Sequence, residues 1–332
     1  MKRAGNLISQ ICEMDNLRQA WLKTVRGKAF SRSVREFRPV LSVRLHQIAE
    51  QLRSGSVSWG PYYCFTIYDP KERVIKVAPL SNRIAYHAIC NVCEPIFDRY
   101  QIYDSYACRV GKGQFAALER AQQFARRNEW YLKLDVRKYF DSISHEVLFQ
   151  QLQRLFKDPV LLELFSRLLD SYESSPGRGI PIGSLTSQFF ANHCLGTLDH
   201  VVKEHLHVRC YLRYMDDMLL FGGSSWELQQ QERAIRTFLE ENLRLELKPF
   251  QLNRTKRGIP FLGLRVYCRS LRLSHRARYR FRRKYRANCR MFRAGLLTRT
   301  KFLAKMETLF AFLRRTDSVK FRQRILQEGF GS

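Results

Sequence analysis

Acidic residues are scarce in this sequence of 332 residues. It has 30 Asp and Glu against 58 Lys and Arg, a formal net charge of +28. An excess of this size implies a polyanionic partner, and nucleic acid is the leading candidate. A ribosomal protein or a protein of the membrane surface remains an alternative at this point.

Long apolar runs and regularly spaced cysteines are also missing. No segment approaches the length of a membrane span, and the nine cysteines follow no disulfide framework. We therefore expect reduced thiols, a cytoplasmic location and no membrane partner. Cys90 and Cys93 form a Cys-x-x-Cys motif, which indicates either a zinc site or two buried thiols of one helix. A structural zinc site needs four ligands, so the second interpretation is favoured.

The apolar content is ordinary, and the charge is uneven. A hydrophobic share of 45% excludes a disordered or fibrous chain and allows two or three subdomains. Residues 251–332 hold 23 Lys and Arg against three Asp and Glu, whereas residues 1–250 hold 35 against 27. This distribution predicts a catalytic body followed by a basic clamp. We expect the clamp to be helical and to bind phosphates, although a solvated surface helix is the alternative.

Hydrophobic periodicity and turn residues predict alternating helices and strands. A strand pair is expected within 62–80, with its turn at Asp69–Pro70. Further strands are expected at 131–134, on both sides of 215–217, and within 243–267. The expected helices cover residues 40–52, 83–97, 114–127, 185–205 and 226–241.

Three aspartates stand out against this background. Asp216 and Asp217 lie side by side between apolar runs, and Asp135 ends a short apolar strand. An isolated Asp-Asp pair is more often a turn than a site. Apolar flanks, however, make two adjacent negative charges costly unless a cation is present. Three such carboxylates can hold two divalent ions for an in-line nucleotidyl transfer, and Mg²⁺ suits an all-oxygen set of ligands.

The motifs, in this order, resemble those of reverse transcriptases. YACRVGKG resembles the fingers motif, and LDVRKYFDSI resembles the first catalytic motif. PIGSLTSQFFAN resembles the loop and helix beneath the nascent base pair, YMDD the second catalytic motif, and GIPFLG the primer-grip turn. The set spans residues 60–267, and it is far more specific than any one motif.

The resemblance implies an RNA-directed DNA polymerase with a right-hand α+β fold. The expected parts are an N-terminal helical extension (1–56), fingers (57–130, with 145–180), a palm (131–267) and a basic helical thumb (268–332). The implied cofactors are two Mg²⁺ ions, with Mn²⁺ as a substitute, and the implied partners are template RNA, a DNA or RNA primer, and dNTPs. The implied metal-binding catalytic residues are Asp135, Asp216 and Asp217. The implied nucleotide-binding residues are Arg73, Arg109, Lys112, Phe140, Ile182, Gly183 and Gln188. The implied primer- and template-binding residues are Phe261, Leu262, Gly263, Arg282, Arg283 and Lys284.

One departure from the family pattern narrows the resemblance. Most reverse transcriptases have Gln where this chain has Ile182, and an aliphatic side chain cannot donate a hydrogen bond to the nucleotide site. Weaker positional control should lower copying fidelity, although neutral drift would leave the same residue. The IGSLTSQ form resembles the bacterial or phage reverse transcriptases of diversity-generating retroelements. That resemblance implies errors at template adenines, a template-repeat RNA and a small basic accessory protein oligomer.

A second departure concerns the residue after the LELKP segment. Relatives have a Lys near position 251 that assists the leaving group, whereas this chain has Gln251 and a nearby Lys248. The sequence leaves open whether Lys248 substitutes. Two other functions also stay open: a retron-like or antiphage-defence reverse transcriptase, and a non-catalytic nucleic-acid-binding protein with a decayed palm.

Overall fold

The computed structural model describes residues 2–68 and 72–330, so the predicted turn at Asp69–Pro70 lies outside the described residues. The chain divides into two units, each built from three segments. The first unit comprises Met1–Val110, Asp135–Arg209 and Arg233–Pro249, and the second comprises Gly111–Leu134, Cys210–Glu232 and Phe250–Ser332.

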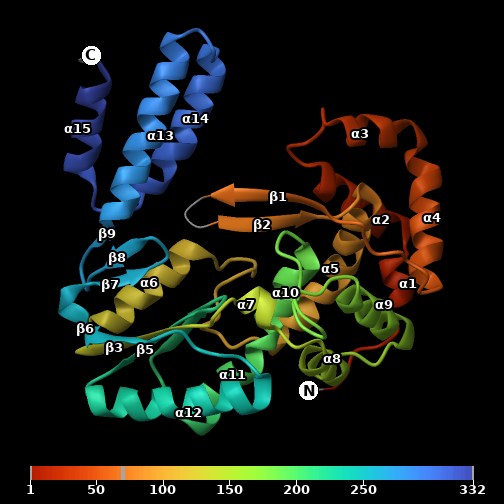
Figure 1. Ribbon diagram of the computed structural model, residues 1–332, viewed down its shortest axis with the longest axis horizontal. Coiled ribbons are helices and arrows are strands. Elements are labelled where there is room, and N and C mark those ends of the chain that lie inside the picture. The colour runs from red at the N-terminus through yellow and green to blue at the C-terminus, as the bar shows by residue number, and fades with distance from the viewer. Residues whose placement is uncertain (1, 69–71, 331–332) are drawn as a thin grey trace. The chain divides into compact units, whose positions relative to one another are not determined.

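The first unit is mostly helical and has an antiparallel ribbon of two strands. Its core forms around α5, whose residues Ile84, Ile89 and Phe97 are buried, and α2 and α10 pack on this helix. The ribbon pairs β1 (Tyr63–Tyr68) with β2 (Glu72–Val77). The helices are α1 (Ile8–Ile11), α2 (Met14–Val25), α3 (Arg32–Phe37), α4 (Leu41–Arg53), α5 (Leu80–Tyr100), α7 (Tyr139–Ser142), α8 (His145–Leu155), α9 (Pro159–Asp170), α10 (Leu185–Cys194) and α11 (Gly196–His200) (Figure 1).

The second unit contains two antiparallel sheets. Four strands run in the order β4-β5-β3-β6, and three run in the order β7-β8-β9. Helix α6 (Gln114–Ala125) packs against β4, β5 and β8 (Figure 1). The strands are β3 (Trp130–Asp135), β4 (Tyr211–Tyr214), β5 (Asp217–Gly222), β6 (Gln251–Arg254), β7 (Ile259–Phe261), β8 (Leu264–Val266) and β9 (Leu271–Leu273).

The basic C-terminal segment folds as three helices after β9. They are α13 (His275–Arg293), α14 (Arg299–Arg314) and α15 (Val319–Phe330), and α13 contacts both of the others. Phe281 and Tyr285 of α13 are four residues apart, and both are buried. The side chains of Ser274 and Thr298 accept a hydrogen bond from the first turns of α13 and α14, which fixes where these helices begin.

One expectation about a single element changes. The single helix expected over 185–205 is three segments, because a turn at Leu195 separates α10 from α11 and a π-helix follows over Val201–His205. Helix α12 (Ser225–Leu243) is close to its expected range. Across the described residues, no helix is long and apolar enough to cross a membrane.

Candidate active site

The YMDD segment forms a tight hairpin in the second unit. Tyr214 of β4 pairs with Asp217 of β5, so Met215 and Asp216 make a two-residue turn. Met215 has a φ of +55°, a left-handed conformation that costs a non-glycine residue about 1–2 kcal/mol. Strain of this kind persists only where surrounding contacts hold it. The turn therefore presents Asp216 at the hairpin tip, while Asp217 begins β5.

A buried arginine supports this turn. The side chain of Arg213, in β4, is fully buried, and its Nη1 donates to the carbonyl oxygen of Met215 at 3.0 Å. Burying a guanidinium costs free energy unless it is hydrogen-bonded, so the bond to Met215 offsets part of the cost of burying Arg213. Arg213 is not among the residues predicted from the sequence, although a lone basic residue within an apolar strand is a signal for it.

Asp217 is held by a lysine from the neighbouring strand. The Nζ of Lys133, in β3, lies 2.9 Å from Asp217 Oδ1, and it also donates to the carbonyl oxygen of Pro260 at 3.2 Å. Asp217 Oδ1 is buried and has no hydrogen-bond partner, so the first contact is an ion pair without hydrogen-bond geometry. Lys133 thus connects the second aspartate of YMDD to the turn that the sequence predicted as the primer grip.

Asp135 belongs to the first unit and is also paired with a lysine. It is the last residue of β3, and its carbonyl oxygen accepts a hydrogen bond from the backbone of Lys248 at 2.9 Å. The Lys248 ammonium donates to the Asp135 carboxylate. Lys248, which follows the isolated β-bridge of Leu247 with Val136, therefore contacts the first catalytic motif, a partner that the sequence did not predict.

Several predicted nucleotide-site residues lie together in the first unit. The amide of Ile180 donates to the carbonyl oxygen of Phe140 at 2.9 Å, and the amide of Lys76 donates to that of Ile182 at 2.8 Å. The 180–183 loop is therefore fastened between α7 and β2. Gly183 has a φ of +114°, and a Cβ there would lie 2.9 Å from Ile75 Cγ2. Arg73 is exposed, and strand alternation places it on the same face of β2 as Ile75.

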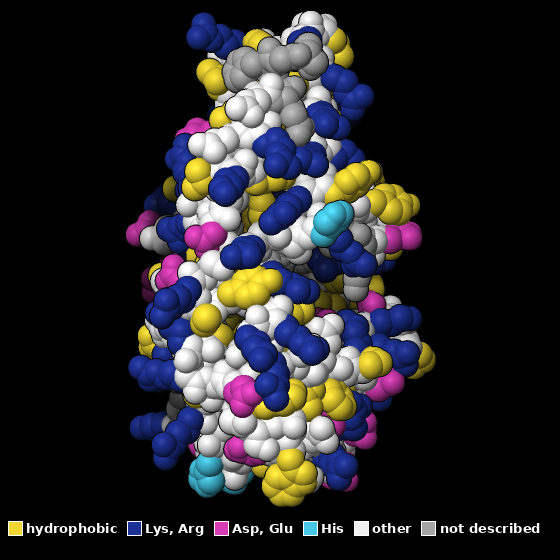
Figure 2. Space-filling view, turned by 90° about the vertical axis from the view of Figure 1, so that its left-hand side faces the viewer, with side chains coloured by type: hydrophobic (Ala, Val, Ile, Leu, Met, Phe, Trp, Pro, Cys, Tyr) yellow, Lys and Arg dark blue, Asp and Glu magenta, His cyan; other side chains and the backbone are white. Residues whose placement is uncertain are grey.

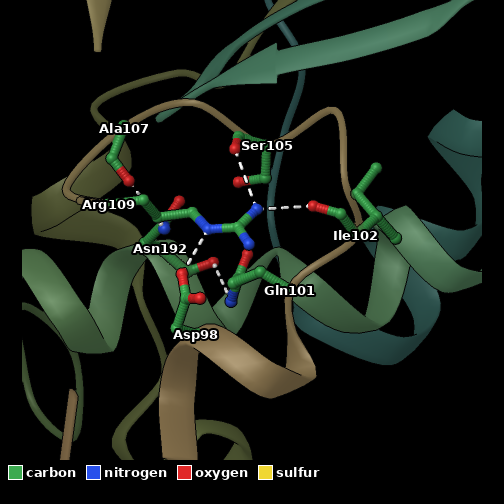
Figure 3. A network of polar contacts seen from close by, with 7 residues as sticks. All are labelled: Asp98, Gln101, Ile102, Ser105, Ala107, Arg109 and Asn192. Atoms are coloured by element: carbon green, nitrogen blue, oxygen red, sulfur yellow. Dashed lines mark hydrogen bonds and ion pairs between the residues drawn. The ribbon is translucent and has the colours of Figure 1, made fainter. Parts of the chain in front are cut away.

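Arg109 is engaged in the scaffold of its own loop (Figure 3). Its Nε donates to Asp98 at 2.5 Å, and its Nη1 donates to the carbonyl oxygens of Ile102 and Ser105 at 2.6 and 3.0 Å. The side chain is only 11% exposed. These contacts give Arg109 a structural role in shaping residues 98–109, and its contact with a triphosphate stays a prediction.

The same loop is attached to α10. Asn192 Nδ2 donates to the carbonyl oxygen of Ala107 at 3.0 Å, and Gln101 Nε2 donates to that of Asn192 at 3.4 Å (Figure 3). The thiol of Cys108 donates to Gln188 Oε1 at 3.6 Å, so Gln188 faces this loop. Lys112 belongs to the second unit. Its side chain is half-buried and interacts with other groups of the protein.

The predicted primer grip is the turn between β7 and β8. Phe261 is buried and pairs with Leu264, while Leu262 and Gly263 have φ of +47° and +80°. Gln114 Nε2, at the start of α6, donates to the carbonyl oxygen of Leu262 at 2.8 Å. The three cations of α13 that were predicted to bind template and primer have different surroundings. Arg282 lies over the ring of Phe321 at 5.7 Å, whereas Arg283 and Lys284 are exposed.

The Cys90–Cys93 pair consists of buried thiols. Both lie in α5, and burial raises the pKa of each thiol, which disfavours the thiolate that zinc requires. Within the described residues, no further His, Cys, Asp or Glu joins them in a metal-binding group. All nine cysteines are free, in agreement with the expectation of reduced thiols.

Comparison with known proteins decides the family. The model of the family described as reverse transcriptase (RNA-dependent DNA polymerase) matches residues 69–266, which is more than half of the chain and includes all three aspartates. The chain belongs to this family. The predicted α+β right-hand polymerase class is confirmed by this match together with the antiparallel sheets.

Individual relatives of this reverse transcriptase are distant. It is 23% identical over 173 residues to the putative COX1/OXI3 intron 1 protein of Saccharomyces cerevisiae, covering 49% of this chain and 21% of that protein. It is 25% identical over 167 residues to nuclear intron maturase 4, mitochondrial, of Arabidopsis thaliana, covering 48% and 21%. Protein YkfC of Escherichia coli is 23% identical over 278 residues, covering 68% and 72%. The chain spans about a fifth of the length of the two intron proteins.

A solved structure with a similar fold is the telomerase from Candida albicans in complex with a fragment of telomeric RNA. The sequence identity is 14% and the TM-score is 0.46, over 85% of this chain and 58% of that one.

Enzymes of the reverse transcriptase family generally use divalent metal ions, and the donor chemistry of this chain fits such ions. The carboxylates of Asp135, Asp216 and Asp217 are the oxygen donors that such ions prefer. Asp135 and Asp217 are each paired with an ammonium group, which an incoming ion would have to displace or share the carboxylate with. Asp135 lies in the first unit and Asp216 and Asp217 in the second, and their joint metal site stays a prediction.

Proposed function

We propose that this chain is an RNA-directed DNA polymerase that copies an RNA template into cDNA. The observation that carries the proposal is the strained YMDD hairpin, in which Arg213 and Lys133 hold the turn and Asp217 in a member of the reverse transcriptase family. In this proposal Asp135 and Asp216 bind two divalent ions directly, and Asp217 supports them. The bound ions would activate the primer 3′-hydroxyl and stabilise the leaving pyrophosphate.

The remaining residues of the proposed site bind and orient the substrates. The exposed guanidinium of Arg73 would bind the triphosphate, because its planar fork matches phosphate oxygens. Phe140 would exclude a ribose 2′-hydroxyl and so select dNTPs. The turn at Phe261–Gly263 would position the primer end. Lys133 contacts both Pro260 and Asp217, and it would therefore hold this turn in place beside Asp217.

We further propose that copying is error-prone at template adenines, as in diversity-generating retroelements. The backbone of Ile182 is fixed by Lys76, and Gly183 is packed closely against Ile75. The loop is therefore rigid in its backbone, but at position 182 it offers an aliphatic side chain in place of an amide donor. Such a site would hold the base pair by shape and would lack one polar check on its geometry. A small basic accessory protein oligomer would assist this activity.

Primer extension on a defined RNA template with Mg²⁺ tests the polymerase. We expect Asp216→Asn to lower the rate by about 10³-fold, comparable to the loss of one group that stabilises transition-state charge. Asp170→Asn, at an exposed position at the end of α9, makes the same charge change and should leave the rate unaltered. No extension by the wild-type chain would instead support a non-catalytic nucleic-acid-binding protein, and full activity of Asp216→Asn would contradict the role proposed for Asp216.

Sequencing the same products tests the mutagenic role. Misincorporation should concentrate opposite template adenine, fall in Ile182→Gln, and persist in Ile182→Val, which keeps an aliphatic side chain. Uniformly accurate copying by the wild-type chain would contradict the mutagenic role and leave the polymerase intact. That outcome would favour a retron-like or defence enzyme, or a role with introns of the kind that the names of the relatives suggest.

A further inference from the structure

A basic pocket lies where β9, α13 and α15 meet in the second unit. It has a volume of about 470 Å³, and we call it the β9–α15 pocket. Its lining includes Leu273 of β9, Phe321 of α15, and Ser318 just before that helix. The upper part of the face in Figure 2, formed by the C-terminal helices, carries many Lys and Arg side chains and few Asp and Glu. The charged residues of the lining are Arg272, Arg278, Asp317, Lys320 and Arg324.

The positive charge of this pocket exceeds its negative charge, because four cations and one acid line it. Among the described residues, none of its four cations forms an ion pair, although Arg272 also lies over the ring of Tyr267 at 5.1 Å. The single acid, Asp317, is used structurally, since its Oδ2 accepts from the amide of Leu271 at 2.6 Å. Four like charges around one concavity repel one another, and an anion bound there would relieve that repulsion.

This pocket lies on a different side of α13 from Arg283, one of the three cations that the sequence predicted to bind template and primer. At 100° per residue, Arg283 is about 140° around the helix from Arg278, and Arg290 is about 120° away. Arg283 and Arg290 are exposed on this outward side. Arg282 instead lies over Phe321, a residue of the pocket lining, and belongs to the pocket side of α13.

We propose that the β9–α15 pocket binds a backbone phosphate of an RNA segment other than the template–primer duplex. The helical thumb would then hold nucleic acid on two sides, with the duplex on the outward side of α13 and a second RNA segment at the pocket. Three of the four cations are arginines, whose planar forks match phosphate oxygens better than a lysine does. The proposal rests on the proposed function only in assigning the duplex to the outward side.

The test compares two RNA-containing ligands and two double variants of the full chain. The ligands are a short blunt RNA–DNA duplex and the same duplex carrying a long single-stranded RNA extension. The pocket variant is Arg278→Gln with Arg324→Gln, and the matched control is Arg283→Gln with Arg290→Gln. All four positions are exposed, so the thermal midpoints of both variants should equal that of the wild type.

We expect the pocket variant to lose affinity only for the extended ligand. Its slope of log K against log salt for that ligand should become shallower by about 1 to 2, since each lost phosphate contact on a single strand changes the slope by about 0.7. Binding and extension of the short duplex should be unchanged. The outward-side variant should weaken binding of both ligands. A further variant, Arg278→Lys with Arg324→Lys, keeps the charge and should recover most of the slope.

Three results would overturn the proposal. Equal losses for both ligands in the pocket variant would place the pocket in the duplex interface, and no loss for either would show that it binds no RNA. The third result would show that the pocket binds a free anion. In that case calorimetry would detect inorganic pyrophosphate binding to the wild type but not to the pocket variant, and the slopes of log K against log salt for RNA would be equal in the two proteins. Polymerase activity on the short duplex is read separately, so failure of this proposal is distinguishable from failure of the proposed function.

Discussion

At the scale of single residues, Lys133 determines how readily a divalent ion reaches Asp217. The ammonium lies 2.9 Å from the carboxylate and is 17% exposed, so it competes with any incoming cation for the same charge. We expect Lys133→Met to lower the Mg²⁺ concentration for half-maximal extension about fivefold, because a half-buried ion pair contributes about 1 kcal/mol.

Calorimetric titration of Mg²⁺ without dNTP checks the same change independently of activity. Lys133→Arg should keep a midpoint near that of the wild type, and Lys301→Met, at an exposed position in α14, controls for the loss of one charge. An unchanged or higher midpoint in Lys133→Met would mean that its contact with Pro260, and not its charge on Asp217, is the important one.

The candidate site residues could be read from the sequence only where a motif carried them. Asp135, Asp216 and Asp217 follow from residue type and order. Lys133 and Arg213 do not, because their roles depend on which strand lies beside which and on which side chains are buried. Arg109 has the right residue type for phosphate, yet its Nε and Nη1 donate to Asp98 and to two carbonyl oxygens of its own loop.

At the scale of elements, the 180–183 loop and the β1–β2 ribbon depend on one glycine. A Cβ at Gly183 would lie 2.9 Å from both Ile75 Cγ2 and the carbonyl oxygen of Lys76, and a φ of +114° is itself unfavourable for other residues. We expect Gly183→Ala to cost about 1–3 kcal/mol from backbone strain alone. Displacing β2 should also raise the KM for dNTP by about 10- to 100-fold, because Arg73 lies on this strand.

Gly177→Ala is the matched control for that prediction. Gly177 precedes the same loop and has a φ of +67°, but nothing lies within 4 Å of a Cβ there. Chemical denaturation and steady-state kinetics should show that it shares the loss of stability and leaves the KM unaltered. If both variants change the KM equally, close packing of the loop on β2 does not control nucleotide binding.

The existence of most of the longer elements was predictable, whereas element breaks were not. The ranges of β3, α6 and α12 follow from apolar periodicity within a few residues. The break between α10 and α11 was missed because 185–205 is continuously compatible with a helix. Just after the break, a Cβ at Gly196 would lie 2.8 Å from the ring of Tyr100, so a glycine is needed for this close contact. The short strand β9 was missed because the alternation Leu271-Arg272-Leu273 is only three residues long, too short to distinguish a strand without its pairing to β8.

At the scale of the whole molecule, the two units divide the proposed functions unequally. The first unit contains Asp135 and most predicted nucleotide-site residues, and the second contains the YMDD hairpin, the β7–β8 turn and the basic helices. Segments of both units alternate along the chain, so sequence position alone could not assign them. Helix α6, which the sequence placed with the fingers, packs on the strands of the second unit, and the proposed domain boundaries stay a prediction.

The net charge of +28 makes a prediction about binding of the template–primer duplex by the whole chain. Residues 251–332 hold 23 Lys and Arg against three Asp and Glu, so backbone phosphates should supply most of the affinity. If about six phosphates are contacted, log K should fall against log salt with a slope of about −5 and depend little on sequence. Anisotropy titrations of several unrelated duplexes across a range of salt concentrations measure this slope. Asp216→Asn should retain it, because the substitution removes no cation that contacts phosphate. A slope near −1, or a strong preference for one sequence, would mean that base or shape contacts dominate and that the basic helices serve another partner.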